Sequence, residues 1–215
     1  MSPSRAPAST SQEEPKFLDF YFDFVSPYGY LALNQIEALA SRHDRTLRWH
    51  PFHMRAVMKD VLGMTRALAD VPLKGSYVRN DVLRMARYLD VAYKPAPAAG
   101  FSSVAAGRVF YLIHERDSAA AARYARAVFH SHHTLASSPN SWEHCAALAR
   151  QVGVDPALLV EAEQAQRGRD LFRLATDTAV AQGVWGTPTF VVDGEIFWGC
   201  DRIAQLDDWL RRGGW

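Results

Sequence analysis

The sequence has only two cysteines, Cys145 and Cys200, and they lie too far apart to form a CxxC motif. A redox-active dithiol needs two closely spaced cysteines, and a disulfide-stapled framework needs more of them. Both classes are therefore disfavoured. Free thiols are typical of proteins in a reducing compartment, so we predict a cytoplasmic protein.

Two further absences argue against other kinds of partner. No hydrophobic run reaches the roughly 18 apolar residues that a membrane-spanning helix needs, so no membrane partner is expected. The 24 Lys and Arg residues nearly balance the 23 Asp and Glu residues, and no basic run stands out. A nucleic-acid-binding surface would need such an excess, so no nucleic-acid partner is expected either.

The 215 residues do contain ample apolar material, because 48% are hydrophobic and 12% are aromatic. This composition suits one compact domain, or one domain with a large insertion. Residues 1–15 differ from the rest: they are rich in Ser, Pro and Ala and lack an apolar signal core. We expect them to form a disordered leader.

After this leader the chain follows the pattern strand, helix, strand. Residues 16–24 form an aromatic run of strand length, residues 28–42 have helical apolar spacing, and residues 46–52 predict a second strand. Ser26 fits the N-cap of the helix, and Pro27 fits its first position.

A long helical middle follows, and the end of the chain returns to strands. Ala-rich segments punctuated by prolines predict the helices. Asp193-Gly194 is a strong hairpin turn between two short strands, after which a final amphipathic helix is expected. The expected middle helices cover residues 76–89, 102–116, 118–130, 141–152, 156–166 and 169–183, and the late strands cover residues 189–192 and 195–198.

This order of elements predicts an α/β fold with a thioredoxin-like core, β-α-β and then β-β-α, that contains a large all-helical insertion. We expect the thioredoxin-like domain at residues 16–53 and 184–215. The insertion would cover residues 54–183, with residues 169–183 as the connecting helix.

The first candidate site is the segment Asp23-Phe24-Val25-Ser26-Pro27-Tyr28, where a strand runs into a helix N-terminus. Free N–H groups and the positive end of the helix dipole favour an anion there, and the Ser26 hydroxyl can add a hydrogen bond. A bound thiolate would suit this position. The alternative is that Ser26 only caps the helix.

The second candidate is the segment Gly183-Val184-Trp185-Gly186-Thr187-Pro188-Thr189-Phe190. A proline directly before a strand, with glycines two and five residues earlier, indicates a fixed turn, for which a cis peptide bond is one option. Such a turn leaves the backbone of Thr187 free to pair with an extended peptide. The alternative is an ordinary turn before an edge strand.

In combination these motifs resemble one family, the 2-hydroxychromene-2-carboxylate isomerases and kappa-class glutathione transferases of the DsbA-like thioredoxin superfamily. The resemblance covers nearly the whole chain after the leader. Its segments, in order, are D-F-x-S-P, M-K-D, V-P-L-K-G-x-Y, G-V-x-G-T-P-T-F and F-W-G-C-D-R.

The resemblance implies a glutathione site. Ser26 would hydrogen-bond the sulfur and keep it as thiolate, and the backbone of Thr187 would pair with the cysteinyl unit. The other implied cofactor contacts are Lys74, Trp198, Gly199, Cys200 and Asp201.

Some of these contacts have plain alternatives. Asp201 suits the free α-amino group of glutathione, and Lys74 suits a carboxylate, unless Lys74 is a solvated surface lysine. Cys200 stands where relatives commonly carry Asn or Ser. Its thiol could form a mixed disulfide with glutathione or be inert.

The resemblance also implies a small aromatic substrate near Lys59, although Lys59 could be a surface residue at a helix edge. Tyr28 and Trp185 would line this pocket, unless both are core aromatics. The implied reaction is a glutathione-dependent isomerisation of the hydroxychromene-carboxylate type. Transfer of glutathione to an electrophile, peroxide reduction, and a non-catalytic glutathione-binding module are the alternatives.

Two other features are weighed by the same reasoning. His130, His132 and His133 crowd at a predicted helix end without an acidic or cysteine partner at ligand spacing, so no metal is expected. Relatives are often dimers, which leaves a homodimer open.

Overall fold

A computed structural model describes residues 15–95 and 100–215, so the expected leader lies, except for Pro15, outside the described residues. The strands are β1 (Phe17–Phe22), β2 (Thr46–Pro51), β3 (Thr189–Val192) and β4 (Glu195–Trp198). The α-helices are α1 (Pro27–Arg42), α2 (Met54–Ala56), α3 (Lys74–Tyr88), α4 (Val104–His114), α5 (Ser118–His133), α6 (Trp142–Gln151), α7 (Glu161–Ala181) and α8 (Ile203–Arg212).

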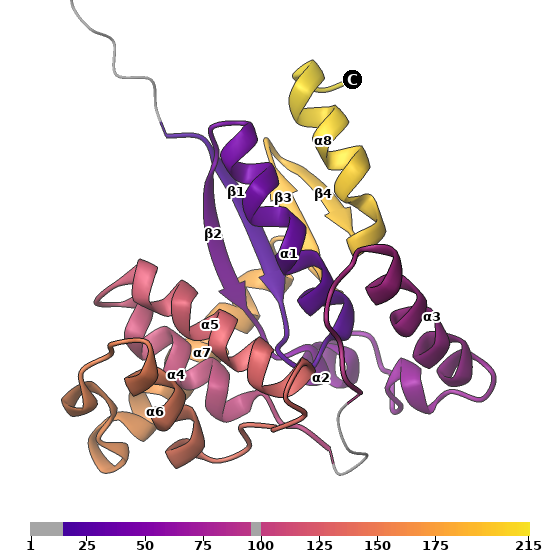
Figure 1. The fold of residues 1–215 in the computed structure, drawn as a ribbon. Coiled ribbons are helices and arrows are strands. Elements are labelled where there is room, and N and C mark those ends of the chain that lie inside the picture. The colour runs from indigo at the N-terminus through magenta and orange to yellow at the C-terminus, as the bar shows by residue number, and fades with distance from the viewer. Residues whose placement is uncertain (1–14, 96–99) are drawn as a thin grey trace, which may run out of the picture.

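The strands form one mixed sheet in the order β2-β1-β3-β4 (Figure 1). β1 and β2 are parallel because helix α1 crosses over between them, whereas β3 runs antiparallel to both β1 and β4. Asp193 and Gly194 close the β3–β4 hairpin with positive φ angles of 52° and 86°, as the favoured two-residue turn requires. The expected thioredoxin-like fold is confirmed.

The two faces of the sheet are covered by different helices. Phe20 and Phe22 point from β1 into the main core on the α1 side, and both are fully buried. Tyr21, between them, points to the other face, where it packs in a smaller cluster with Ala179 of α7. Helix α8 lies beside α1 (Figure 1). This alternation is the period-two pattern of a strand buried on both sides.

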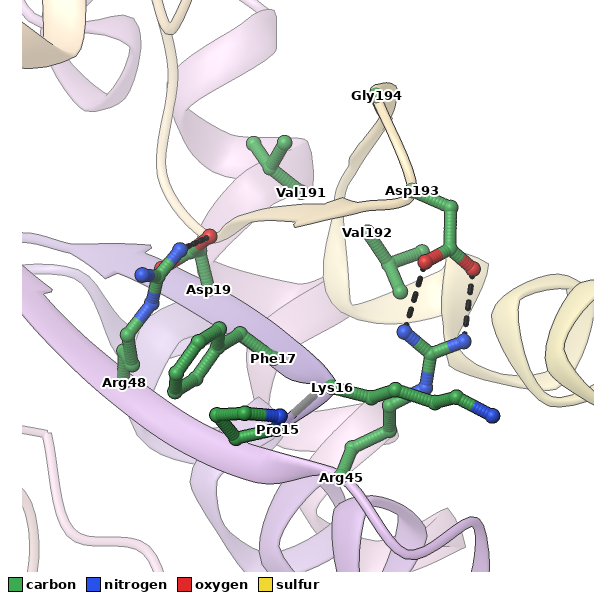
Figure 2. A pocket seen from close by; sticks show the side chains of 10 residues that line it. All are labelled: Pro15, Lys16, Phe17, Asp19, Arg45, Arg48, Val191, Val192, Asp193 and Gly194. Carbon is green, nitrogen blue, oxygen red and sulfur yellow. Dashed lines mark hydrogen bonds and ion pairs between the residues drawn. The ribbon is translucent and has the colours of Figure 1, made fainter. Parts of the chain in front are cut away.

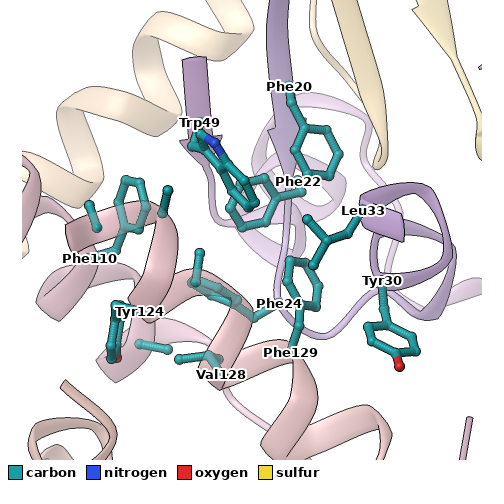
Figure 3. Packing of buried hydrophobic residues seen from close by; sticks show 14 of the residues in the cluster. Phe20, Phe22, Phe24, Tyr30, Leu33, Trp49, Phe110, Tyr124, Val128 and Phe129 are labelled. Atoms are coloured by element: carbon teal, nitrogen blue, oxygen red, sulfur yellow. The ribbon is translucent and has the colours of Figure 1, made fainter. Parts of the chain in front are cut away.

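The main core runs without a break from the sheet into the helical middle (Figure 3). Phe129 of α5 is the junction: its ring centroid lies 5.2 Å from that of Phe22 and 5.3 Å from that of Phe24. Edge-to-face contacts of Phe22 with Trp49 and Phe110 extend the cluster to β2 and α4. Aromatic packing therefore holds the site-bearing strand against the helices.

The prediction of separate helices at residues 156–166 and 169–183 is wrong. A short 3₁₀ helix, Pro156–Leu159, precedes one long helix, α7. Gly168 lies inside α7, where a Cβ would come within 3.2 Å of Arg108 and Leu112 of α4. This glycine does not end the helix; it allows two helices to pack closely.

Residues 54–70 contain short elements that periodicity did not predict. After α2 come a π-helical turn at Val57–Val61 and a 3₁₀ turn at Leu68–Asp70. Across residues 15–95 and 100–215, no helix combines the length and apolar character needed to cross a bilayer.

Candidate functional site

Ser26 ends the turn after β1 and is the N-cap of α1, as its sequence position predicts. Its backbone is extended, with φ −80° and ψ 115°, and its Oγ accepts a hydrogen bond from the Gly29 N–H at 3.1 Å. Pro27 occupies the first helical turn. Ser26 as a whole is 7% exposed, so the residue is buried at the N-terminus of the helix.

The turn before β3 has a cis peptide bond between Thr187 and Pro188, the option that the sequence left open. Two hydrogen bonds hold this turn to neighbouring segments. Thr187 Oγ1 accepts a hydrogen bond from the Asp23 N–H at 3.0 Å, and the Pro188 carbonyl accepts one from the Gly199 N–H at 2.9 Å. Within the described residues, no hydrogen bond occupies the backbone N–H or C=O of Thr187.

The Ser26 and Thr187 hydroxyls face the same place in the first turn of α1. Gly29 shows this geometry: a Cβ built on it would lie 3.6 Å from Ser26 Oγ and 3.5 Å from Thr187 Oγ1. Because glycine has no side chain, no Cβ stands between the two hydroxyls at the positive end of the helix dipole. An anionic sulfur fits this donor set.

Trp185 lies two residues before Thr187 in the chain and packs against Trp198 at the end of β4. The ring centroids of Trp185 and Trp198 are 4.2 Å apart, and the side chains keep 44% and 49% of their area exposed. Gly186 permits this arrangement, since a Cβ there would come within 2.3 Å of Trp198 Nε1. The pair offers an apolar surface of the kind that binds aromatic ligands.

The segment after β4 turns sharply at Gly199, whose φ is 113°. Asp201 lies immediately beside it and is mostly exposed; a Cβ on Gly199 would come within 2.4 Å of Asp201 Oδ1. Cys200 is buried instead. Burial, reinforced by the charge of Asp201, raises the pKa of its thiol to about 12, so this thiol is protonated at neutral pH.

Tyr28 contacts helix α3, a neighbour that its position in the sequence did not indicate. Its hydroxyl donates to Asp81 of α3 at 2.8 Å, and Arg84 pairs with the same carboxylate at 2.6 Å. Burial and then Asp81 raise the pKa of the Tyr28 phenol. The ring thus joins the start of α1 to helix α3.

The two lysines lie on the segment that precedes and opens α3. Lys59 is in the π-helical turn Val57–Val61, and Lys74 is the first residue of α3; both are exposed. No described hydrogen bond joins either lysine to Ser26 or Thr187.

Asp23 is the site residue that sequence reasoning missed. It is 1% exposed, and its carboxylate accepts hydrogen bonds from the Val25 N–H at 3.1 Å and the Met54 N–H at 2.9 Å. Burial raises the pKa of Asp23, against the effect of hydrogen bonds from Ser103 and from these two amides. An acid inside an aromatic run, three residues before Ser26, was the available signal.

His132 and His133 of α5 are buried and hydrogen-bonded inside the protein. His133 Nε2 lies 2.9 Å from the Phe24 carbonyl, and His132 Nδ1 lies 2.9 Å from Ser138 Oγ. Burial lowers the pKa of His132 to about 4 and that of His133 to about 3. No three His, Cys, Asp or Glu side chains among the described residues are grouped to hold a metal ion.

A second hollow lies at the opposite end of β1, around Phe17 (Figure 2). Its two arginines are already paired: Arg45 binds Asp193 at 2.7 and 2.8 Å, and Arg48 binds Asp19 with two contacts of 2.6 Å. In Figure 2 the two pairs lie on opposite sides of the hollow, with Phe17 between them. The two arginines therefore present little free charge to a ligand in this hollow.

Comparisons with known proteins find enzymes that this chain resembles along most of its length. The chain is 28% identical over 196 residues to a 2-hydroxychromene-2-carboxylate isomerase from Sphingobium xenophagum, covering 91% of this chain and 98% of that one. It is 26% identical to glutathione S-transferase kappa 1 from Caenorhabditis elegans, covering 91% of each chain.

The fold is also found among solved structures. A 2-hydroxychromene-2-carboxylate isomerase superposes with a TM-score of 0.80 at 25% identity, covering 91% of this chain and 95% of that one. A family model described as a DSBA-like thioredoxin domain matches residues 17–211. The chain therefore belongs to the DSBA-like thioredoxin domain family.

Proposed function

We propose that this protein binds glutathione at the N-terminus of α1 and uses it to isomerise a small aromatic substrate of the 2-hydroxychromene-2-carboxylate type. The observation that carries the proposal is the convergence of Ser26 Oγ and Thr187 Oγ1 beside Gly29, at the N-terminus of α1. The isomerases and kappa transferases among the relatives support the choice of ligand.

Ser26 can cap the helix and hold an anion at the same time. Its Oγ uses a lone pair to accept the Gly29 N–H, which leaves the hydroxyl hydrogen free to donate outward. Directed at a sulfur, that hydrogen and the helix dipole both favour the thiolate over the thiol. Ser26 is in this proposal the catalytic residue.

The remaining cofactor contacts follow the backbone around the cis turn. The free N–H and C=O of Thr187 would pair with the cysteinyl unit in the manner of an added strand. Asp201 is exposed and would bind the α-amino group, with Lys74 for a carboxylate. The γ-glutamyl end would lie along Trp198, Gly199 and Cys200.

The chain would hold the substrate against its aromatic surface. Trp185 supplies a face for ring stacking, and Lys59 supplies a positive charge for a substrate carboxylate. Tyr28 lines the same region while its hydroxyl is held by Asp81.

Glutathione, when bound, would supply a thiolate nucleophile for reversible addition to a conjugated carbon of the substrate, so that the neighbouring bond could rotate with no net consumption of the thiol. No oxidant or second thiol is required, which agrees with a site that has Ser26 and no CxxC. A free thiol cofactor and two free, buried cysteines suit the cytoplasm.

The kappa-class relatives favour a second candidate, transfer of glutathione to an electrophile. The test combines hydroxychromene carboxylate with glutathione and follows product formation and sulfur content. Isomerisation predicts turnover that requires glutathione and a sulfur-free product, whereas transfer predicts a thioether. Ser26→Ala should lower turnover and raise the pKa of the bound thiol.

Full turnover by Ser26→Ala, with an unchanged thiol pKa, would refute the role given to Ser26. Binding of glutathione without turnover of any chromene, aryl halide or peroxide would instead indicate a binding module. Light scattering with and without glutathione would show whether two chains associate.

A further inference from the structure

We infer that Asp23 is the positioning residue of the thiolate site, because its backbone bonds both Ser26 and Thr187 while its buried side chain fixes the turn that carries these bonds. This inference rests on the proposed function. It adds a residue that does not touch the ligand but fixes the two groups that would.

Four hydrogen bonds join Asp23 to the two turns of the site and to the start of α2. Its backbone N–H donates to Thr187 Oγ1 at 3.0 Å, and its carbonyl accepts the Ser26 N–H at 2.9 Å. One carboxylate oxygen accepts the Val25 N–H at 3.1 Å, in the turn between strand and helix. The other accepts the Met54 N–H at 2.9 Å.

The hydrogen bond from Met54 links Asp23 to the segment proposed to contact the substrate. Met54 opens α2, and the same short segment carries Lys59 five residues later. The carboxylate of Asp23 therefore joins the turn that holds Ser26 to the start of the segment proposed to meet the substrate. Along the chain, the turn at Ser26 and the segment that begins at Met54 are separated by α1 and β2.

A neutral side chain of the same shape cannot replace both contacts. The carboxylate accepts at both oxygens, whereas the amide of Asn accepts at one atom and donates at the other. Asp23→Asn thus leaves either the Val25 or the Met54 N–H facing a donor in a fully buried place. Buried amides are almost always paired, so the backbone is expected to move.

A small backbone movement at Asp23 should change the stabilisation of a bound thiolate more than it changes the fold. Stabilisation of an anion by a hydroxyl and a helix terminus depends on distances of a few tenths of an ångström, since hydrogen bonds weaken quickly outside their normal range. A residue that served only the fold would change the free energy of unfolding and leave the bound thiol unchanged.

The experiment measures the pKa of the thiol of bound glutathione by ultraviolet titration of the saturated protein. In Asp23→Asn we expect this pKa to rise by about one unit, a tenfold loss of thiolate at a given pH. Thr176→Val is the matched control: Thr176 Oγ1 accepts the His53 N–H at 3.0 Å, next to Met54 but away from Ser26. It should lower the melting temperature without moving the thiol pKa.

A folded Asp23→Asn protein with the wild-type thiol pKa would overturn the inference. If that variant does not fold, Thr187→Val tests the same link from its other end, because it removes the acceptor of the Asp23 N–H. The thiol pKa should rise there too, although part of that rise would come from the loss of the Thr187 hydroxyl itself. A displaced Ser26 amide signal in the same variant would support the link through Asp23, and an unchanged thiol pKa would overturn the inference.

If wild-type protein does not lower the thiol pKa of glutathione, the proposed function fails, and the ligand-free amide spectrum tests Asp23 separately. Shifted Val25, Ser26 and Thr187 amides in Asp23→Asn, with unshifted ones in Thr176→Val, would support the positioning role. Unshifted amides in both variants would overturn it.

Discussion

The backbone N–H of Asp23 donates to the hydroxyl of Thr187 at 3.0 Å, although 164 residues separate them. The bond joins the turn after β1 to the cis-proline turn before β3. Both turns were recognisable as motifs in the sequence. Their connection is what makes them one site, with Gly29 leaving room between the two hydroxyls.

That room can be filled by a single methyl group. Gly29→Ala should fold and gain about 0.5 kcal/mol in the free energy of unfolding, since alanine is the better helix former. The added Cβ would contact Ser26 Oγ and Thr187 Oγ1 at ordinary van der Waals distances and occupy the space proposed for sulfur. Calorimetry should therefore show weaker glutathione binding by a more stable protein. Unchanged affinity would place the sulfur elsewhere.

The tryptophan pair depends on a different glycine. Gly186→Ala should displace the Trp198 indole, because the new Cβ would come within 2.3 Å of its Nε1. We expect a loss of about 1–3 kcal/mol in the free energy of unfolding, typical of overpacking, and a change in tryptophan fluorescence. Gly100→Ala, where a Cβ meets no atom within 4 Å, is the control. Equal effects of the two changes would contradict the contact.

Both cysteines should resist thiol reagents in the native protein. Cys200 is 6% exposed with a pKa raised to about 12, and Cys145 is fully buried with a pKa raised to about 11. The reactive species is the thiolate, so neither should form a mixed disulfide with oxidised glutathione at neutral pH. Mass spectrometry would detect the adduct. Denaturant should make both cysteines reactive, and rapid native modification of Cys200 would contradict its burial.

The buried histidine next to the site turn predicts how stability depends on pH. His133 has a folded pKa of about 3, below the ordinary 6.5, so the unfolded chain binds the extra proton first as pH falls. Stability from this group is complete above about pH 6.5 and decreases below it, by about 1.4 kcal/mol per pH unit. The neighbouring His132, whose pKa burial lowers to about 4, contributes in the same direction, so urea unfolding of the wild type at several pH values measures the sum of the two.

The contribution of His133 can be isolated by substitution. His133→Gln keeps a donor for the Phe24 carbonyl but cannot titrate, so its stability should depend less on pH between about 6.5 and 4. His130→Gln changes an exposed histidine of the same helix and should retain the wild-type slope. Identical slopes for both variants would show that His133 is not the titrating group.

Local sequence signals predicted the parts of the site that are themselves local. Ser26 as an N-cap, the Thr187-Pro188 turn and the Asp193-Gly194 hairpin each depend on a few adjacent residues. Contacts between distant segments were not predictable in this way. Nothing in the spacing of Tyr28 and Asp81 indicates that their side chains meet.

Glycines show the same limit. The sequence predicted two helices, at residues 156–166 and 169–183, where the structure has Gly168 inside one helix. The role of this glycine depends on the close packing of α4, which the sequence does not indicate. The boundaries of the thioredoxin-like domain at residues 16–53 and 184–215 remain a prediction. The shared core around Phe129 shows why composition alone cannot divide the chain.

The hydrogen bond from Gly29 to Ser26 also determines what kind of alcohol this serine is. Within the described residues, its oxygen has no histidine or carboxylate partner that could remove the proton, and one lone pair is already engaged by the helix. Ser26 should therefore be a poor nucleophile and resist the fluorophosphonates that label serine hydrolases. In the proposed site, Ser26 donates a hydrogen bond to the sulfur and forms no covalent bond to carbon or phosphorus itself.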